Sequence, residues 1–118
     1  MKTILIVDDE LGNAEALGLL LEDEGFRVLC AYNGQEGLAQ VNEVLPDLVI
    51  LDYMMPLMNG GEVARKLREN EATRHIKIIM NSSLTESSIH SYFAGYDAFI
   101  RKPYSFDDLL TTVHTLLS

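Results

Sequence analysis

The chain has 118 residues, the size of one ordinary domain, and 47% of them are hydrophobic, enough for a real core. No apolar run approaches the roughly eighteen residues of a membrane span, and the single cysteine excludes an internal disulfide. The net charge of −9 disfavours direct binding to nucleic acid. We therefore expect one soluble, cytoplasmic domain over residues 1–118, with no direct contact to nucleic acid or membrane.

Short apolar runs alternate with stretches of helical periodicity along the whole chain. The third run is almost wholly apolar, which is typical of a parallel strand covered on both faces. Five strand–helix units indicate an α/β fold with a doubly wound parallel sheet. The expected strands lie at residues 2–7, 27–31, 48–51, 76–80 and 98–100.

A helix is expected after each strand. Asn33 and Ser105 can cap the second and fifth helices, and Asp108 follows Ser105 at capping-box spacing. Thr85 can cap a short fourth helix that runs through Ile89. The expected inward positions of the first, third and fourth helices are Ala14, Leu17, Leu20, Leu21, Gly60, Val63, Ala64, Leu67, Ile89, Tyr92 and Phe93.

Polar residues follow four of the predicted strands. In open α/β sheets, ligands bind beyond the carboxyl ends of the strands, so these residues are expected to meet at one edge. The site would gather carboxylates from two strands, hydroxyls from a third and an ammonium from a fourth. In chain order the residues are Asp8, Asp9, Glu10, Asp52, Asn81, Ser82, Ser83, Lys102 and Pro103.

Converging carboxylates raise one another's pKa unless a cation neutralises them. Mg²⁺ prefers hard oxygen ligands and leaves coordination positions for water and phosphate. The pattern therefore predicts a Mg²⁺ site that receives a phosphoryl group. Asp52 can act as the oxygen nucleophile, and Lys102 can neutralise charge on the transferring group.

Three segments resemble the signatures of response-regulator receiver domains. They are residues 4–10 (ILIVDDE), 51–60 (LDYMMPLMNG) and 101–103 (RKP), and the resemblance covers the whole chain in the family's order and spacing. It implies a flavodoxin-like sheet of strand order 2-1-3-4-5 with five helices. It also implies a signalling domain of a two-component system or phosphorelay. Such a domain is no separate enzyme, beyond Mg²⁺-dependent self-phosphorylation and autodephosphorylation.

The resemblance also assigns the groups that would take part in phosphoryl transfer. Asp52 would be the phosphoacceptor and Lys102 the phosphate-contacting lysine. Asp9 would bind Mg²⁺ directly and Asp8 partly through water, with Asp52 and the backbone carbonyl of Met54 completing the protein ligands.

Further positions match those that transmit the signal or border the phosphoryl group. Ser82 and Phe99 match the switch hydroxyl and the switch aromatic residue. Ser83, Met54 and Leu84 match the positions that control access to the phosphoryl group. The resemblance also implies a cis peptide bond between Lys102 and Pro103.

The implied partners are a sensor histidine kinase or histidine phosphotransfer protein and an unidentified output protein or domain. The chain would be a monomer or a phosphorylation-dependent dimer. The stretch from Ser82 to Lys102 is about two residues shorter than in the best-known members of the family. Because that region carries output and dimer contacts in the family, its shortening bears on the mode of partner binding.

Three other functions share part of this pattern. A haloacid dehalogenase-type phosphatase also uses an Asp nucleophile and Mg²⁺, but it needs a second Asp where this chain has Met54. A flavodoxin needs a hydroxyl-rich phosphate loop after the first strand, where acidic residues 8–10 would repel phosphate. A degenerate receiver would signal without phosphorylation, although here the acceptor is present.

Several residues invite a functional interpretation but have a simpler one. His75, His90 and His114 lie on different elements and are expected at the surface. Cys30 is expected to be a buried thiol. Methionines at 54, 55 and 58 are better explained by loop packing than by a soft-metal site.

Overall fold

The computed structural model describes residues 1–90 and 95–118 of the chain. Its strands form one five-stranded parallel sheet in the order β2-β1-β3-β4-β5, which confirms the predicted fold class. The strands are β1 (Thr3–Val7), β2 (Arg27–Ala31), β3 (Leu48–Asp52), β4 (Lys77–Ser82) and β5 (Ala98–Arg101).

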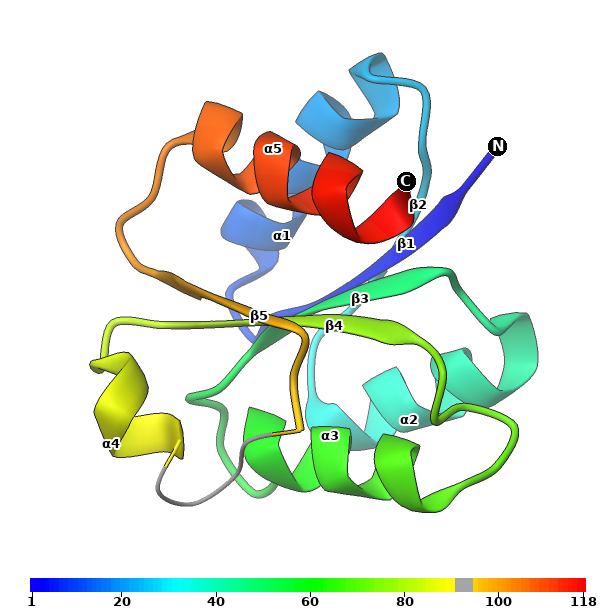
Figure 1. Cartoon of the computed structure of the whole chain (residues 1–118), viewed down its shortest axis with the longest axis vertical. Helices are drawn as coiled ribbons and strands as arrows, with labels where there is room; N and C mark the ends of the chain where they lie inside the picture. The colour runs from blue at the N-terminus through cyan, green and yellow to red at the C-terminus, as the bar shows by residue number, and fades with distance from the viewer. Residues whose placement is uncertain (91–94) are drawn as a thin grey trace.

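Helices cover both faces of the sheet (Figure 1). One face carries α1 (Leu11–Asp23) and α5 (Phe106–Leu117), and the other carries α2 (Gly34–Val44) and α3 (Gly60–Glu69). The short α4 (Glu86–His90) follows β4. A hydrophobic core lies on each face of the sheet, and alternate residues of a strand point into one core or the other. Ile50 packs with α1 and α5, whereas Leu51 packs with α2 and α3.

Local sequence signals set the helix starts. Asn33 Oδ1 accepts a hydrogen bond from the Glu36 N–H at 2.7 Å. Ser105 Oγ accepts one from the Asp108 N–H at 3.1 Å, so the predicted cap is confirmed. Thr85 Oγ1 likewise accepts from the Ser88 N–H ahead of α4. Tyr92 and Phe93, which were expected on this helix, lie outside the described residues.

Two burial predictions were wrong. Leu20 is 45% exposed, because the first helix turns Ala14, Gly18 and Leu21 towards the sheet instead. Cys30 is half-buried because it lies on the edge strand β2, where its Sγ donates a weak hydrogen bond to the Ala14 carbonyl. The three histidines are exposed, as expected.

The fourth strand is longer than the apolar run suggested. Asn81 and Ser82 were expected beyond the strand, but both are paired within it, Asn81 beside Asp52 of β3 and Ser82 beside Arg101 of β5. Backbone pairing on both sides extends β4 by two polar residues, which are nevertheless buried. This extension places Asn81 level with Asp52 in the sheet.

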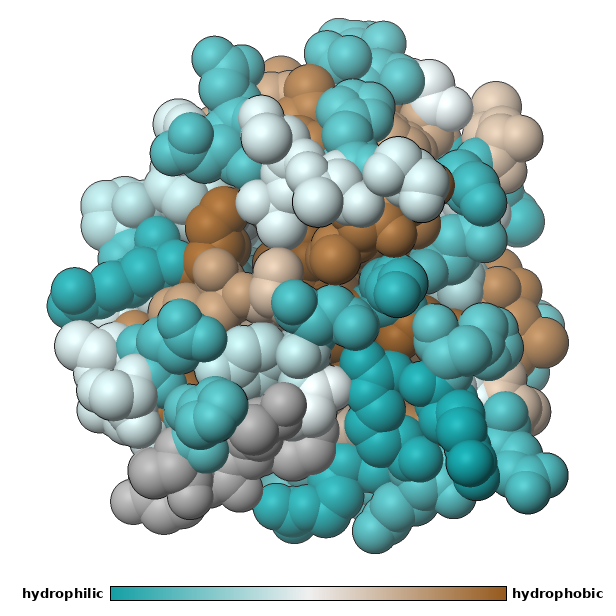
Figure 2. Space-filling view, in the orientation of Figure 1, coloured by the Kyte–Doolittle hydropathy of each residue, from teal (hydrophilic) through white to brown (hydrophobic). Residues whose placement is uncertain are grey.

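The molecular surface is mostly polar. Figure 2 shows an apolar strip in the seam between α5 and the edge strand β5, surrounded by more hydrophilic groups. Partly buried side chains such as Ile100, Leu110 and Leu116 pack into the core at this seam. Among the described residues, no helix is both long and apolar enough to cross a membrane.

Candidate functional site

Asp52 ends the central strand and is held by a close approach of backbone segments. Its side chain is buried, and the residue is 5% exposed. Helix α3 begins against it: a Cβ on Gly60 would lie 2.5 Å from the Asp52 carbonyl oxygen. The Gly60 N–H donates to the Tyr53 carbonyl at 2.8 Å, which closes the loop after β3. A glycine is therefore required here to keep α3 close to Asp52.

Three carboxylates meet where β1 and β3 end. One oxygen each from Asp8, Asp9 and Asp52 lies within 4.8 Å of the other two. Asp8 is buried and accepts a hydrogen bond from the Glu10 N–H at 2.9 Å, whereas Asp9 is exposed. This all-oxygen donor set, open on the Asp9 side, fits a hard divalent cation such as Mg²⁺.

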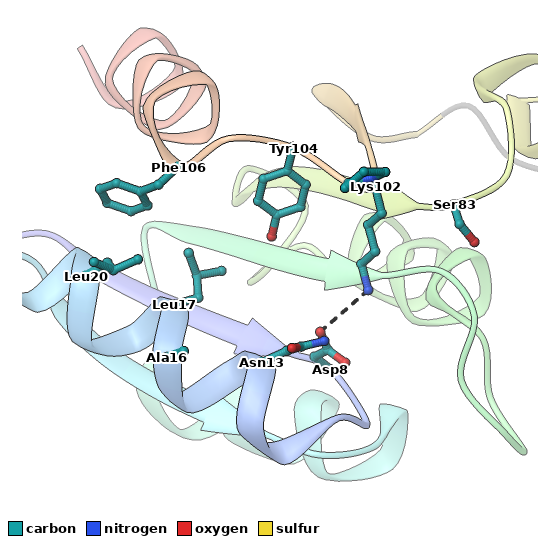
Figure 3. Close-up of a pocket in the computed structure, with 10 residues that line it drawn as sticks. Asp8, Asn13, Ala16, Leu17, Leu20, Ser83, Lys102, Tyr104 and Phe106 are labelled. Carbon is teal, nitrogen blue, oxygen red and sulfur yellow. Dashed lines mark ion pairs between the residues drawn. The ribbon is translucent and has the colours of Figure 1, made fainter.

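Lys102 brings a positive charge to the carboxylates from the end of β5. Its Nζ lies 3.3 Å from Asp52 Oδ1 and 3.7 Å from Asp8 Oδ2, and the latter pair is drawn in Figure 3. The Lys102 N–H donates to the Ser82 carbonyl at 2.8 Å, and the Lys102–Pro103 peptide bond is cis, as expected. The lysine is thus anchored to β4 and aimed across the sheet.

Burial and charge oppose each other in this cluster. Burial raises the pKa of Asp52 to about 6, against the lowering effect of Lys102, and the negative charge of Asp8 adds to the rise. Burial alone would lower the pKa of Lys102, but the Asp52 and Asp8 carboxylates outweigh it and raise that pKa. The cluster thus disfavours the ionised form of Asp52 relative to a free aspartate and favours the charged form of Lys102.

The predicted switch and access residues lie in β4, in β5 and in the loops that follow β3 and β4. Ser82 is buried, and its Oγ accepts a hydrogen bond from the Leu84 N–H at 3.1 Å. Met54 and Leu84 are exposed, in the loops that follow β3 and β4. Phe99 lies on the opposite face of the sheet from Lys102 and packs against the ring of Tyr96.

An apolar pocket of about 470 Å³ opens beside the carboxylates. Figure 3 shows Leu17 and Leu20 of α1 facing Phe106, with Tyr104 between this apolar end and Lys102. The exposure of Leu20 is explained by this pocket. The pocket and the pair formed by Asp8 and Lys102 therefore lie side by side.

The structure brings together Asp8, Asp9, Asp52 and Lys102, as the strand-end rule predicted. Sequence reasoning assigned no role to Tyr104, whose hydroxyl group lies near the charged cluster and has a pKa raised mainly by burial. It also assigned none to Asn81. The available signal for Asn81 was a polar residue directly after the apolar run 76–80, and the structure pairs it with Asp52, the last residue of β3.

Comparison of the sequence with known protein families agrees with the geometry of this site. Residues 4–114 match the family model described as the response regulator receiver domain. The chain belongs to this family. Receiver domains are signalling domains of two-component response regulators, and the acidic cluster of this receiver domain fits the family's Mg²⁺ site.

Relatives and solved structures agree with the family assignment. The receiver domain is 39% identical to the phosphate regulon transcriptional regulatory protein PhoB of Pseudomonas aeruginosa and 38% identical to the response regulator ArlR of Staphylococcus aureus. These alignments cover 98% and 99% of this chain but only 52% and 53% of the relatives. The chain thus spans about half the length of these curated relatives.

Among solved structures, the response regulator TrrA of Thermotoga maritima, in complex with Mg²⁺ and BeF, superposes with a TM-score of 0.88 at 36% identity. That alignment covers 98% of this chain and 99% of TrrA. A receiver domain of a histidine kinase from Syntrophus aciditrophicus gives a TM-score of 0.92 at 34% identity, over 99% and 90% of the two chains.

The raised pKa of Asp52 predicts a pH-dependent stability difference. The folded state binds the Asp52 proton more tightly than the unfolded state, so this stabilisation is present below about pH 4 and lost as the pH rises through about 6. Without divalent cations, Asp52→Asn should therefore be more stable than the wild type by about 1–3 kcal/mol near pH 7.5. The difference should shrink between about pH 6 and 4 in urea unfolding curves. A difference that stays constant with pH would mean that the Asp52 charge is not its source.

Proposed function

We propose that this receiver domain takes a phosphoryl group onto Asp52 in a Mg²⁺-dependent reaction and signals the change to a partner. The observation that carries the proposal is the cluster at the strand ends: Asp52 lies close to the Asp8 and Asp9 carboxylates, and the Lys102 ammonium pairs with both Asp52 and Asp8. A buried carboxylate flanked by both cation-binding and cationic groups suits an oxygen nucleophile that must accept a dianionic group.

The donor would be a phosphohistidine of another protein. An Asp52 carboxylate oxygen forms a bond to phosphorus while the phosphorus–nitrogen bond breaks, and the electron pair of that bond stays on the donor imidazole. Lys102, now 3.3 Å from the Asp52 carboxylate, is placed to neutralise the transferred oxygens. A bound cation would lower the raised pKa of Asp52, because its positive charge favours the ionised carboxylate that acts as the nucleophile.

Mg²⁺ would be held by Asp8, Asp9, Asp52 and the backbone carbonyl of Met54. When bound, it supplies charge neutralisation to the phosphoryl oxygens. The exposed position of Asp9 and the buried position of Asp8 suit one direct ligand and one that acts partly through water. Because the protein offers few ligands, binding to the resting domain is expected to be weak.

The proposed partners are a sensor histidine kinase or a histidine phosphotransfer protein, followed by an output protein or domain. The apolar pocket beside Asp52 gives a donor protein a surface to contact while its histidine approaches. The relatives do not identify the output protein or domain of this chain, because about half of their length lies outside the matched region.

Phosphorylation can be tested directly. Incubation with acetyl phosphate and Mg²⁺ is expected to add one phosphoryl group to Asp52, located by mass spectrometry of the intact and digested protein. Asp9→Asn should lose most of the modification because a direct metal ligand is removed, whereas Asp23→Asn on the exposed end of α1 should behave like the wild type. Equal labelling of Asp52→Asn would place the acceptor elsewhere, and no labelling of the wild type would favour a degenerate receiver.

We infer that Ser82 and Phe99 form the switch. The Ser82 Oγ is occupied by the Leu84 N–H in the resting state, so a phosphoryl group on Asp52 would draw the hydroxyl away from that contact. The Phe99 ring lies 6.0 Å from the Tyr96 ring, and the Tyr96 hydroxyl donates to Glu86 of α4 at 2.9 Å. A turn of Phe99 would therefore reach α4 through Tyr96, as a shift between two arrangements.

Beryllofluoride, a phosphoryl mimic, tests this switch. With Mg²⁺ it is expected to shift the NMR signals of the Leu84 amide and the Phe99 ring in the wild type. Ser82→Ala should bind the mimic but lose the Phe99 response, and Ser87→Ala on the exposed side of α4 should retain it. If α4 responds while Ser82 and Phe99 stay unchanged, the signal follows another route.

We also propose that Met54 and Leu84 make the phosphorylated state long-lived. Hydrolysis needs a water molecule in line with the acyl phosphate, on the side away from Asp52. The two residues border that approach, together with the small Ser83. Both side chains are hydrocarbon-rich and exposed, so they can cover the phosphoryl group but cannot hold or polarise a water molecule.

Slow decay of the phosphorylated protein is therefore expected, measured as loss of the phosphoryl mass with time. Met54→Asn combined with Leu84→Glu should accelerate decay roughly tenfold or more, which corresponds to about 1.4 kcal/mol of barrier. Leu57→Asn is the matched control, because Leu57 is fully exposed in the loop of Met54 but does not border the water approach. Rapid decay of the wild type, or no acceleration in the double variant, would contradict the shielding role.

A further inference from the structure

Asn81 is a buried polar side chain with an unused hydrogen-bonding atom. The residue is 3% exposed, and its Oδ1 is the one buried side-chain oxygen or nitrogen without a hydrogen-bond partner in the described part of the chain. Buried polar atoms are paired in the great majority of cases, because an unpaired acceptor has lost its water without replacement. The unpaired oxygen therefore requires an explanation.

The sheet places this oxygen beside the phosphoacceptor. Asn81 is the register partner of Asp52 on β3, and it is also the partner of Ile100 on β5. Side chains alternate along a strand, and Ile79, two residues before Asn81, packs in the core beneath α1 and α5 together with Ile50. Asp52 follows Ile50 by two residues, so Asn81 and Asp52 project from the same face of the sheet.

Lys102 must cross β4 to reach the carboxylates. Its backbone lies two residues beyond Ile100 at the end of β5, whereas Asp52 lies on β3, about 10 Å or two strand spacings away. The lysine side chain therefore extends over the strand that carries Asn81. At its far end, the ammonium pairs with Asp52 at 3.3 Å and with Asp8 at 3.7 Å.

These two pairs involve two of the three carboxylates that would hold a divalent cation. The ammonium and the cation carry like charges, so Lys102 cannot keep its full contact with Asp8 and Asp52 when those carboxylates hold a metal ion. If the ammonium moves away from the carboxylates, the Lys102 side chain withdraws towards β5, and the ammonium then lies over β4. The Lys102 side chain is partly buried, 26% exposed, so an acceptor on β4 would replace part of the pairing that the ammonium gives up.

We propose that Asn81 is a positioning residue whose Oδ1 accepts a hydrogen bond from the Lys102 ammonium when a divalent cation occupies the Asp8–Asp9–Asp52 cluster. The inference rests on the proposed Mg²⁺-dependent function and adds a residue that it does not use. The amide holds Lys102 one strand away from Asp52, within reach of an incoming phosphoryl group. An amide oxygen suits this role because it accepts from the ammonium without adding a fourth negative charge to the cluster.

A double-mutant cycle on Mg²⁺ binding tests the proposal without measuring activity. The dissociation constant for Mg²⁺ is measured by calorimetry for the wild type, Asn81→Leu, Lys102→Met and the double variant. Leucine keeps the size of asparagine but cannot accept, so Lys102 should remain on the carboxylates and Mg²⁺ affinity should fall roughly tenfold. Lys102→Met should bind Mg²⁺ more tightly than the wild type, and adding Asn81→Leu to it should change the affinity less than twofold.

Controls separate this role from packing. Ile79→Val perturbs the same face of β4 and should leave Mg²⁺ affinity unchanged, whereas Asn81→Thr, with a hydroxyl acceptor, should recover part of the loss. In the wild type, Mg²⁺ should shift the NMR signals of the Asn81 side-chain amide, and this shift should be absent in Lys102→Met. If Asn81→Leu folds poorly, the comparison of Asn81→Val with Asn81→Thr replaces it.

Two results would overturn the inference. Equal Mg²⁺ affinity of wild type and Asn81→Leu would show that the amide has no part in cation binding. A loss of affinity that persists in the Lys102→Met background would show that Asn81 acts through another group. In either case wild-type Mg²⁺ binding and Asp52 labelling would stand, whereas absence of Mg²⁺ binding in the wild type would defeat the proposed metal dependence and this inference together.

Discussion

The packing of like charges at one edge of a parallel sheet is the constraint on which this site depends. Because β1 and β3 are parallel neighbours, Asp8 and Asp9 come to the same edge of the sheet as Asp52, and their carboxylates lie close together. Lys102 offsets part of this repulsion from the end of β5. The domain thus has a carboxylate cluster that fits a divalent cation and whose charge is partly neutralised by the Lys102 ammonium.

This arrangement reduces the stability of the folded domain. Burial raises the pKa of Asp52, so its ionised form is costly until a cation arrives. The unpaired Oδ1 of Asn81 is a second buried group that the resting structure leaves unsatisfied. Both lie on the same face and at the same level of the sheet, and both gain partners if a cation enters and Lys102 moves. Buried groups whose charge or hydrogen bonding is unsatisfied in this way are typical of functional sites.

The site also separates this domain from other proteins with related sheets or chemistry. A haloacid dehalogenase-type phosphatase would need an acid–base group where Met54 presents an exposed thioether. A flavodoxin would need a hydroxyl-rich phosphate loop where Asp8 and Asp9 follow β1. The family match over residues 4–114 agrees with these exclusions.

Much of the fold and of the site could be predicted from the sequence, because it depends on residues close together in the chain. Alternating apolar runs indicated the sheet, Asn33 and Ser105 marked helix starts, and the strand-end rule selected Asp8, Asp9, Asp52 and Lys102. The tertiary structure alone decided which groups find partners. The end of β4, the exposure of Leu20 in a pocket against Phe106 and the unpaired oxygen of Asn81 depend on neighbours far away in the sequence. Hydrophobic periodicity describes which face a residue occupies, whereas hydrogen bonding and charge depend on distances between strands that only the assembled sheet defines.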